Sequence, residues 1–293
     1  MHDKVAVITG SNSGIGKETA VGLAAMGMTT VLACRNQEKA EAAATEVRER
    51  AASQAVHVVA LDLSDLASVT ACADQVLERW GRLDVLVNNA GGIWSKRDES
   101  VQGFEQTFAV NHLGHFALTV LLLDRLKASA PSRIVNLTSV MHHAAVLGMR
   151  WDDLNAQRRY TSFVAYAQAK LANILFTRAL AARLDGTGVT ANAVHPGPVR
   201  SGFGMDGDLT GVVRMGNDLF RTFEMSSQAG ATTSIHVATA PELEQASGGY
   251  YARGQPGRMS RHARSQPDAD RLWRISEQLI DQAGFPAGGA ERN

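Results

Sequence analysis

The sequence is poor in cysteine, in charge of one sign and in long apolar runs, and each shortage excludes a class of protein. It holds two cysteines among 293 residues, Cys34 and Cys72. Two do not suggest a disulfide framework, so both are expected to be small buried apolar side chains. The 29 basic and 29 acidic residues give a formal net charge of zero. No basic field is available for nucleic acid or for a membrane surface.

No apolar stretch approaches the roughly 20 residues that cross a bilayer. The apolar run at residues 5–8 is too short for the core of a secretory signal. We therefore expect a cytoplasmic protein without a membrane span, and no metal site is predicted. The hydrophobic share of 45% and the charged share of 20% are typical of a globular protein with a sizeable core.

Short apolar runs alternate with longer amphipathic segments along the chain. This alternation is typical of a parallel sheet with helices on both faces. Strands are expected at residues 5–8, 30–33, 56–61, 85–87, 133–137 and 189–194, with a seventh near 249–252. Helices are expected at residues 14–26, 37–52, 66–79, 101–128, 164–184 and 226–239. We predict one α/β domain over residues 1–293, with a sheet of about seven strands.

Two segments depart from this rhythm. Residues 202–225 hold five glycines among bulky apolar side chains. A mobile lid over an apolar substrate is one interpretation of the segment at about 200–225, and packing against a partner subunit is another. Residues 254–266 are polar and basic, and a last amphipathic helix is expected near 269–283.

A glycine-rich turn follows the first predicted strand and opens a helix. Its residues are Gly10, Ser11, Asn12, Ser13, Gly14, Ile15 and Gly16. Glycines here let the backbone turn tightly and approach a pyrophosphate, while the helix N-terminus offers free N–H groups. The spacing of the three glycines differs from the commoner Gly-x-Gly-x-x-Gly, and a purely structural turn is the alternative.

The end of the second strand carries no acid. A carboxylate about 20 residues past the glycines ordinarily binds a ribose 2′-hydroxyl. Cys34 stands there instead, and Arg35 and Asn36 follow it. A guanidinium can pair with a 2′-phosphate that a carboxylate would repel, so NADP(H) is expected over NAD(H). The alternative for Arg35 is a solvated cation at a strand end.

Polar and small residues also follow the third and fourth strands, at the edge where a ligand would lie. They are Asp62 and Leu63, then Asn89, Ala90 and Gly91. Asp62 could accept a hydrogen bond from an adenine amino group, or it could cap the next helix, as could Ser64. Asn88 and Asn89 could instead satisfy buried backbone groups.

Tyr166 and Lys170 lie four residues apart in a predicted helix and so share a face. A neighbouring ammonium favours the phenolate and is expected to lower the pKa of a tyrosine. Ser139, just past the fifth strand, could hold a carbonyl oxygen beside the phenol. Asn111, inside an apolar helical segment, could hold a water that links Lys170 to solvent, or it could be a structural asparagine that bends the helix.

A rigid turn follows the sixth strand. Pro196 and Pro198 fix it, and Gly197 lets the chain pass close to a flat ring. His195 is expected to be a packed turn residue rather than a base.

Taken together, these residues resemble the short-chain dehydrogenase/reductase family, because the motifs occur in that family's order from about residue 4 to 280. The stretches 33–36, 167–177 and 195–197 and the insert with Trp151 resemble its retinol-dehydrogenase branch. The resemblance implies a Rossmann fold and a catalytic tetrad of Asn111, Ser139, Tyr166 and Lys170. It implies Tyr166 as the general acid in reduction and the base in oxidation, and Lys170 as a ligand of the nicotinamide ribose.

The resemblance also implies that Pro196, Gly197 and Val199 meet the nicotinamide. Many relatives in that branch carry an N-terminal membrane helix, and the sequence shows none, which puts membrane-delivered retinoid in doubt as a substrate. The family's Thr after this turn is replaced by Ser201, and the serine before the active lysine by Ala169.

The predicted function is therefore hydride transfer between NADP(H) and a carbonyl or alcohol, most simply the reduction of a lipophilic ketone or aldehyde. The alternatives are a non-catalytic NADP(H)-binding regulatory module and a redox-neutral epimerase or dehydratase. A homodimer or homotetramer through the helices that bear Asn111 and Tyr166 is common in such proteins.

Overall fold

The computed structural model describes residues 1–197 and 226–285. Val199, Ser201, the expected substrate loop at about 200–225 and the last eight residues lie outside the described part. The described chain folds around one eight-stranded sheet in the order β3-β2-β1-β4-β5-β6-β7-β8. The strands are β1 (Val5–Thr9), β2 (Thr29–Cys34), β3 (Val56–Ala60), β4 (Val85–Asn88), β5 (Ser132–Leu137), β6 (Val189–His195), β7 (Tyr250–Ala252) and β8 (Gln255–Pro256).

The first seven strands are parallel, as predicted. The eighth was not foreseen: β8 pairs antiparallel with β7. Arg253 and Gly254, which join the two strands, both have positive φ, of 53° and 73°. Positive φ at two successive residues is the geometry of a tight hairpin turn. A two-residue edge strand of exposed residues has no apolar pattern, so the sequence gives no sign of it.

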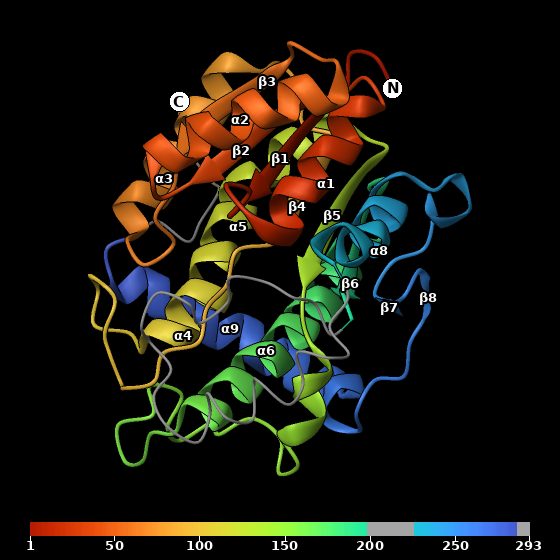
Figure 1. Cartoon of the computed structure of the whole chain (residues 1–293). Helices are drawn as coiled ribbons and strands as arrows, with labels where there is room; N and C mark the ends of the chain where they lie inside the picture. Colours follow the sequence, from red (N-terminus) through yellow and green to blue (C-terminus); the bar gives the residue numbers. More distant parts are fainter. Residues whose placement is uncertain (198–225, 286–293) are drawn as a thin grey trace.

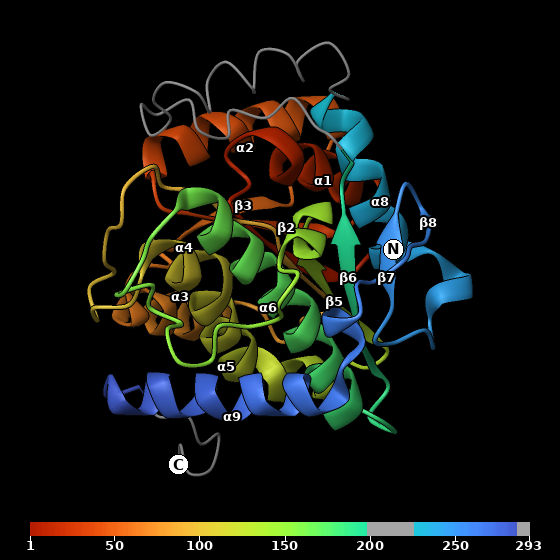
Figure 2. The ribbon, with the colours of Figure 1, turned by 90° about the horizontal axis from the view of Figure 1, so that it is seen from below.

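Helices cover both faces of the sheet (Figures 1 and 2). On one face lie α1 (Gly14–Ala25), α2 (Gln37–Ala51) and α8 (Ser227–Thr239), and on the other lie α3 (Leu66–Arg79), α5 (Gly114–Ala128), α6 (Ser162–Arg183) and α9 (Gln266–Gln282). Two separate apolar clusters fill the two interfaces between the sheet and the helices. The sheet is therefore buried on both sides, which explains the nearly continuous apolar runs of its strands.

The helix that was predicted over residues 101–128 begins later and is interrupted. Glu105 caps the short α4 (Gln106–Phe108), since its carboxylate accepts hydrogen bonds from the backbone N–H groups of Thr107 and Phe108. A π-helical turn, η1 (Ala109–Leu113), separates α4 from α5. The predicted start was wrong because a side-chain cap, not the apolar pattern, decides where the backbone becomes helical.

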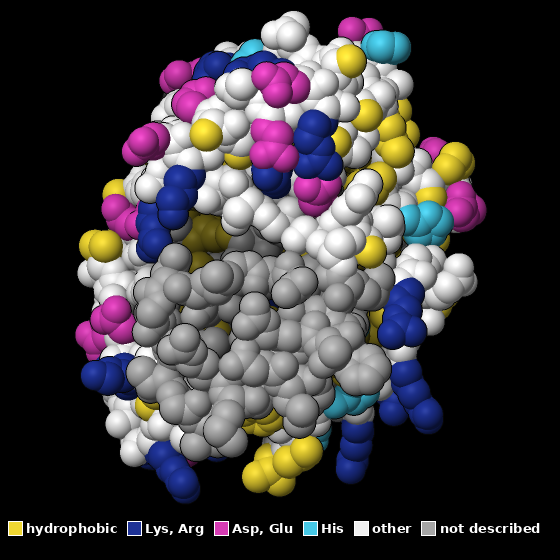
Figure 3. All heavy atoms as spheres, in the orientation of Figure 1, with side chains coloured by type: hydrophobic (Ala, Val, Ile, Leu, Met, Phe, Trp, Pro, Cys, Tyr) yellow, Lys and Arg dark blue, Asp and Glu magenta, His cyan; other side chains and the backbone are white. Residues whose placement is uncertain are grey.

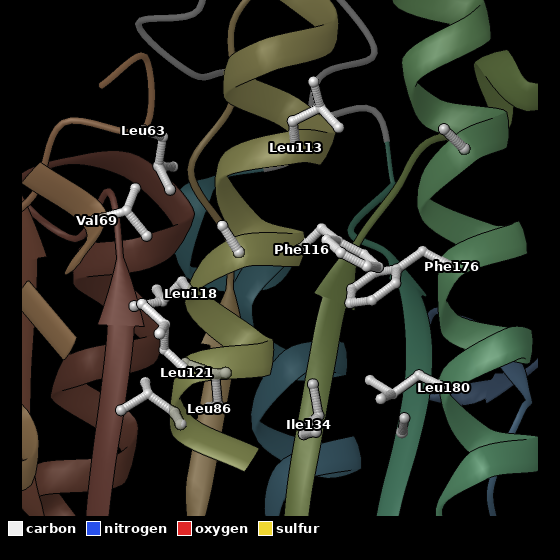
Figure 4. Packing of buried hydrophobic residues seen from close by; sticks show 14 of the residues in the cluster. Leu63, Val69, Leu86, Leu113, Phe116, Leu118, Leu121, Ile134, Phe176 and Leu180 are labelled. Atoms are coloured by element: carbon white, nitrogen blue, oxygen red, sulfur yellow. The ribbon is translucent and has the colours of Figure 1, made fainter. Parts of the chain in front are cut away.

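The core beside α5 and α6 is rich in aromatic side chains. Phe116 on α5 and Phe176 on α6 point toward one another (Figure 4), with 5.5 Å between ring centroids. Trp273 on α9 closes this group, at 4.9 Å from Phe116. Helix α9 therefore packs across the outer sides of α5 and α6 (Figure 2). Its predicted bounds were short by one turn at the N-terminus, where Ser265 caps the helix through the N–H of Asp268.

Charged side chains on the surface of α1 and α2 form ion pairs and do not cluster into patches of like charge. Arg50 on α2 binds Glu18 on α1 at 2.7 Å, and Lys17 on α1 binds Glu46 on α2. Figure 3 shows basic and acidic side chains side by side over these two helices. This part of the surface therefore carries no field of one sign.

Candidate active site

A cavity of about 810 Å³ opens along the edge of the sheet where the parallel strands end. Loops that follow six strands, β1 to β6, line it. This is the position at which open α/β sheets bind ligands, because the carboxyl ends of neighbouring parallel strands meet there. Seventeen of the predicted cofactor residues line it: Gly10, Asn12, Ser13, Gly14, Ile15, Gly16, Arg35, Asn36, Asp62, Leu63, Asn89, Ala90, Gly91, Tyr166, Lys170, Pro196 and Gly197.

The glycine turn has the conformation that its sequence predicts. Gly10 and Gly14 have φ of 63° and 57°, which side-chain-bearing residues rarely adopt. A Cβ at Gly16 would lie 2.5 Å from the side-chain nitrogen of Asn89, so only glycine fits. Helix α1 begins at Gly14, and Ser13 provides no side-chain cap. The first N–H groups of α1 are therefore left for a ligand in the cavity.

Ser11 differs from the prediction. Its side chain is buried behind the turn, where Oγ donates to the carbonyl of Ile8 at 2.8 Å, and it does not line the cavity. Ser11 also lies 3.6 Å from the sulfur of Cys34, and burial raises the pKa of that thiol. Both side chains thus support the backbone of the turn and of β2.

Arg35 lies exposed on the cavity rim and has no ion pair with the described residues. Lys39, which was not among the predicted residues, joins it from the first turn of α2. Asn36 has a local role as well, because its side chain caps α2 by accepting the N–H of Lys39 at 2.9 Å. Two cations that form no ion pair with a described residue therefore border the cavity just past β2. Its position one turn into the helix that follows β2 could have predicted that Lys39 lies near the cofactor site.

Asp62 also lines the cavity, but it does not cap the helix that follows, α3. Asp65 caps α3 by accepting the N–H of Ala67, so neither Asp62 nor Ser64 has that role. Asp62 instead accepts the N–H and the hydroxyl of Ser64, at 2.9 and 2.6 Å. These bonds form an Asx turn that holds the carboxylate at the cavity.

The two asparagines after β4 act differently. Asn89 donates from its side chain to the carbonyls of Thr9 and Gly10, at 2.7 and 3.2 Å, and so ties the glycine turn to the next strand. Asn88 is buried, and its nitrogen donates to side-chain oxygens of Thr119 and Asn136. The alternative in which these residues satisfy backbone groups therefore holds for Asn89 only.

Ser139, Tyr166 and Lys170 meet at the other end of the cavity. Ser139 caps η2 (Val140–Ala144) immediately after β5, and its hydroxyl is hydrogen-bonded to the phenol of Tyr166. Tyr166 and Lys170 project from α6, with the ammonium nitrogen 5.3 Å from the centre of the phenol ring. Lys170 is 4% exposed, and its nitrogen donates to the carbonyl of Leu137 at 3.5 Å.

The sequence predicted a lowered pKa for Tyr166, and in the structure this pKa is not lowered. Burial raises the pKa of Tyr166 above its ordinary value, and the hydrogen bond with Ser139 offsets only part of that rise. Burial also lowers the pKa of Lys170 to about 8. The prediction was wrong because it counted the attraction between phenolate and ammonium but not the loss of solvation of each charge.

Asn111 lies in the π-helical turn η1 and is fully buried, just behind the cavity wall. Its side-chain nitrogen donates to the carbonyls of Gly92 and Thr107, at 2.9 and 2.8 Å. Its oxygen Oδ1 has no hydrogen-bond partner within residues 1–197 and 226–285. A Cβ built at Gly91 would lie 2.5 Å from this oxygen and 3.4 Å from the Lys170 nitrogen, so both atoms border one small space. An unpartnered acceptor beside an ammonium is a place where a water could be held.

The turn after β6 reaches the same cavity with His195, Pro196 and Gly197. Gly197 has φ of 88°, which only glycine adopts readily. Burial lowers the pKa of His195 to about 4, in agreement with a neutral packed residue. Gly92, Ile93, Trp94 and Val110, which the sequence analysis did not name, add a partly apolar wall.

The described part of the chain meets the requirements of neither a metal site nor a membrane-spanning helix. Residues 1–197 and 226–285 contain no group of three or more histidine, cysteine, aspartate or glutamate side chains placed to hold a metal ion. Within the same residues no helix has the length and hydropathy needed to cross a membrane.

The glycine turn, the cavity at the carboxyl edge and the Ser139–Tyr166–Lys170 group define an oxidoreductase of the Rossmann type that uses a nicotinamide cofactor. The family model described as short chain dehydrogenase matches residues 4–151 and 153–210. The chain belongs to this family, in its retinol-dehydrogenase-like branch.

Known relatives agree with this placement. Retinol dehydrogenase 12 of Mus musculus is 48% identical over 278 residues, which cover 94% of this chain and 86% of the relative. Retinol dehydrogenase 13 of Homo sapiens is 43% identical, over 94% of this chain and 84% of the relative.

Solved structures share the fold. A putative uncharacterized protein from Mycobacterium paratuberculosis is similar with a TM-score of 0.76 and 35% identity, over 96% of this chain and 94% of that one. The Pseudomonas aeruginosa RhlG/NADP active-site complex is similar in fold, with a TM-score of 0.68 and 24% identity over 86% of this chain and 95% of that one.

Proposed function

We propose that this protein transfers hydride between NADP(H) and the carbonyl carbon of a lipophilic ketone or aldehyde, with Tyr166 as the proton donor. The observation that carries the proposal is the hydrogen bond between Ser139 and Tyr166 inside the cavity that also contains the glycine turn and Lys170. One cavity thus joins a pyrophosphate cradle to a polarising hydroxyl and an acid.

The cavity fits a nicotinamide dinucleotide. Free N–H groups at the start of α1 suit the pyrophosphate, and Gly16 and Gly91 leave room where a Cβ would clash. Arg35 and Lys39 suit a 2′-phosphate, and the buried Cys34 replaces the acid that would repel it. When bound, the nicotinamide supplies or accepts the hydride.

The protein's own groups handle the proton. In reduction, the Ser139 hydroxyl holds the substrate oxygen and Tyr166 donates its proton to that oxygen as negative charge develops there. Burial keeps the phenol protonated at neutral pH, which suits an acid. The Lys170 ammonium then stabilises the phenolate that forms. Asn111 Oδ1, which no described residue hydrogen-bonds, holds a water through which Lys170 exchanges protons with solvent.

The apolar residues Ile93, Trp94 and Val110 in the cavity wall support a lipophilic substrate. The relatives named retinol dehydrogenase support the same class of alcohol or aldehyde. The cytoplasmic location, the oligomeric state and the role of the loop at 200–225 stay predictions.

Purified protein should be screened with NADPH and NADH against retinal, other lipophilic aldehydes, steroids and polycyclic ketones, following loss of the reduced nicotinamide. Turnover with NADPH is expected for at least one apolar carbonyl. Tyr166→Phe should lower kcat by about 100-fold or more while the Kd for NADPH changes by less than about twofold. The matched control is Tyr251→Phe, on strand β7 and outside the cavity lining, which should leave both values unchanged.

NADPH binding without turnover on any substrate would favour a non-catalytic binding module instead. Substrate conversion without net consumption of the cofactor would favour an epimerase or dehydratase. Retention of more than a tenth of wild-type kcat in Tyr166→Phe would reject Tyr166 as the proton donor.

A further inference from the structure

A buried histidine lies between the glycine turn and Asn111. His115, in the first turn of α5, is 3% exposed. One ring nitrogen, Nε2, lies 2.9 Å from the hydroxyl of Thr9, the last residue of β1. The other, Nδ1, lies 3.2 Å from the backbone carbonyl of Asn111. The ring therefore bridges two parts of the site that come from distant segments of the chain.

The neighbours of His115 fix which nitrogen carries the proton. The carbonyl of Asn111 can only accept, so Nδ1 must be the donor. The Thr9 hydroxyl already accepts the backbone N–H groups of Asn89 and Ala90, both at 2.9 Å. Both of its lone pairs are then occupied, so it donates its own proton, and Nε2 is the nearer acceptor, because the alternative carbonyl of Val87 lies at 3.4 Å. The Asn111 end requires a proton on Nδ1 and the Thr9 end requires an unprotonated Nε2, and together they define the neutral Nδ1–H form.

A second proton on this ring would have no acceptor. An Nε2–H would face a hydroxyl whose lone pairs are both in use. Burial lowers the pKa of His115 to about 4, which agrees with a neutral ring. The hydrogen bonds therefore run in one direction, from Thr9 to His115 and from His115 to Asn111.

Thr9 and Asn111, the two ends of this series of hydrogen bonds, both affect the small space around Gly91. Thr9 holds the backbone of Asn89 and Ala90, which leads directly into Gly91. Asn111 presents Oδ1 to Gly91, 2.5 Å from where a Cβ would stand. Asn111 lies in the π-helical turn between α4 and α5, and such turns occur frequently at functional sites.

We infer that His115 is a positioning residue that, through its bonds to the Thr9 hydroxyl and the Asn111 carbonyl, fixes Asn111 against the Gly91 loop. This inference rests on the proposed function of the site, in which Asn111 holds a water beside Lys170. His115 itself lies outside the cavity lining and touches neither cofactor nor substrate. We assign the water to Oδ1 of Asn111, which has no hydrogen-bond partner among the described residues.

His112 provides a matched control on the same stretch of chain. It is also fully buried, but its Nε2 is 2.8 Å from the hydroxyl of Ser276 on α9, away from the cofactor turn. The same substitutions at His112 and His115 remove a comparable amount of buried imidazole. Loss of stability is common to both positions, and an effect on the site is expected at His115 only.

Two substitutions separate the two ends of the ring. The side-chain amide of Gln reaches the place of Nε2, and that of Asn reaches the place of Nδ1. His115→Gln keeps the partner of Thr9 but leaves the Asn111 carbonyl bare, so kcat should fall by about tenfold with the Kd for NADPH within about twofold. His115→Asn keeps the donor to Asn111 but frees Thr9 and the Gly91 loop, so the Kd for NADPH should rise by about fivefold with kcat less affected.

The measurements are kcat, the Kd for NADPH by fluorescence and the Tm, for these variants and for His112→Gln and His112→Asn. The opposite kcat and Kd pattern of the two His115 variants supports the inference. Changes in kcat and Kd that merely follow Tm at both positions would overturn it. The Kd measurement needs no turnover, so a failure of the proposed function, shown by active Tyr166→Phe, is recognised separately.

A measurement on the unaltered protein covers the case in which a variant does not fold. Nitrogen-15 NMR of isotope-labelled histidine distinguishes the two neutral ring forms. The His115 signal, assigned from its absence in either variant or from through-bond correlations, should show the Nδ1–H form near neutral pH. Observation of the Nε2–H form or of a doubly protonated ring would contradict the proposed hydrogen bonds from Thr9 to His115 and from His115 to Asn111.

Discussion

Gly91 and Asn111 are packed so closely that no side-chain carbon fits between them. A Cβ at Gly91 would lie 2.5 Å from Asn111 Oδ1. The φ of Gly91 is not positive, so the restriction is steric and not conformational. The absence of a side chain here is what lets the loop after β4 approach the buried amide and the ammonium of Lys170 together.

Gly91→Ala should therefore damage the site more than the fold. The added methyl group must displace the Asn111 amide or the loop, and we expect kcat to fall by about 100-fold with a loss of Tm of only a few degrees. The control is Gly81→Ala, since nothing lies within 4 Å of a Cβ at Gly81. A Gly91→Ala variant with the kcat of the Gly81→Ala variant would contradict the steric argument.

Substitution of the rim cations should change the choice of cofactor. Arg35→Asp places a carboxylate where a 2′-phosphate would lie, so the KM for NADPH should rise about 100-fold and the KM for NADH much less. Lys39→Ala should have a smaller effect in the same direction, since Lys39 contributes a single exposed charge.

The comparison needs a cation away from the cavity. Arg50→Ala removes a charge of α2 that pairs with Glu18 and Glu46, and it should leave both KM values unchanged. An equal rise of the two KM values in Arg35→Asp would refute the assignment of Arg35 to the 2′-phosphate.

Acid should unfold the protein through its buried histidines. Burial lowers the pKa of His112 to about 3 and those of His115 and His142 to about 4. Above the ordinary pKa of about 6.5 these rings are neutral in both the folded and the unfolded chain. Between 6.5 and 4 the unfolded chain binds protons that the folded chain does not, so the unfolding free energy falls as pH falls.

Each of these three rings should cost about 2 kcal/mol of stability at pH 5, and a domain has about 5–15 kcal/mol in total. Urea unfolding at pH 7.5, 6 and 5, values chosen around the ordinary histidine pKa, should show this fall. His142→Gln should flatten the dependence, whereas the same substitution at the exposed neighbour His143 should leave it unchanged. A flat profile in the unaltered protein would show that the buried rings are not excluded from protonation.

Helix α9 should contribute a large part of the stability of the α5–α6 side. Trp273 lies 7% exposed between Phe116 and Phe176, and the guanidinium of Arg183 lies 4.3 Å above its ring. Trp273→Ala should lower the unfolding free energy by about 3–5 kcal/mol. Arg274→Ala, on the exposed side of the same helix, is the control and should change it by less than about 0.5 kcal/mol.

The same helix bears on association between subunits. A dimer that uses α5 and α6 would meet α9 rather than bare helices, because α9 already covers them (Figure 2). Size-exclusion chromatography of the Trp273→Ala variant should therefore show more self-association than the unaltered chain. Identical elution of the two would contradict this expectation.

Local patterns predicted much of the fold and of the site. Alternating apolar runs predicted the seven parallel strands, since a strand buried on both faces has to be apolar along its length. The glycine turn was recognisable because Gly10 and Gly14 adopt positive φ, a conformation that glycine readily adopts without help from distant contacts. Tyr166 and Lys170 were recognisable because four residues make one turn of helix.

Features that depend on contacts between distant segments were missed. Strand β8, for example, exists only because β7 presents an edge with which it can pair. The rise in the Tyr166 pKa follows from burial, and the sequence does not state how deeply a helix face is covered.

The sequence by itself therefore determined the order of strands along the chain, the glycine turn and the pairing of Tyr166 with Lys170 on one helix face, because each depends on residues close together in the chain. Only the tertiary structure decided that Asn111 Oδ1 meets Gly91 and Lys170, and that His115 joins Thr9 to Asn111. Those contacts link β1, the loop after β4, η1, α5 and α6 across more than 100 residues. Their distances follow from sheet register and helix packing, which no local pattern encodes.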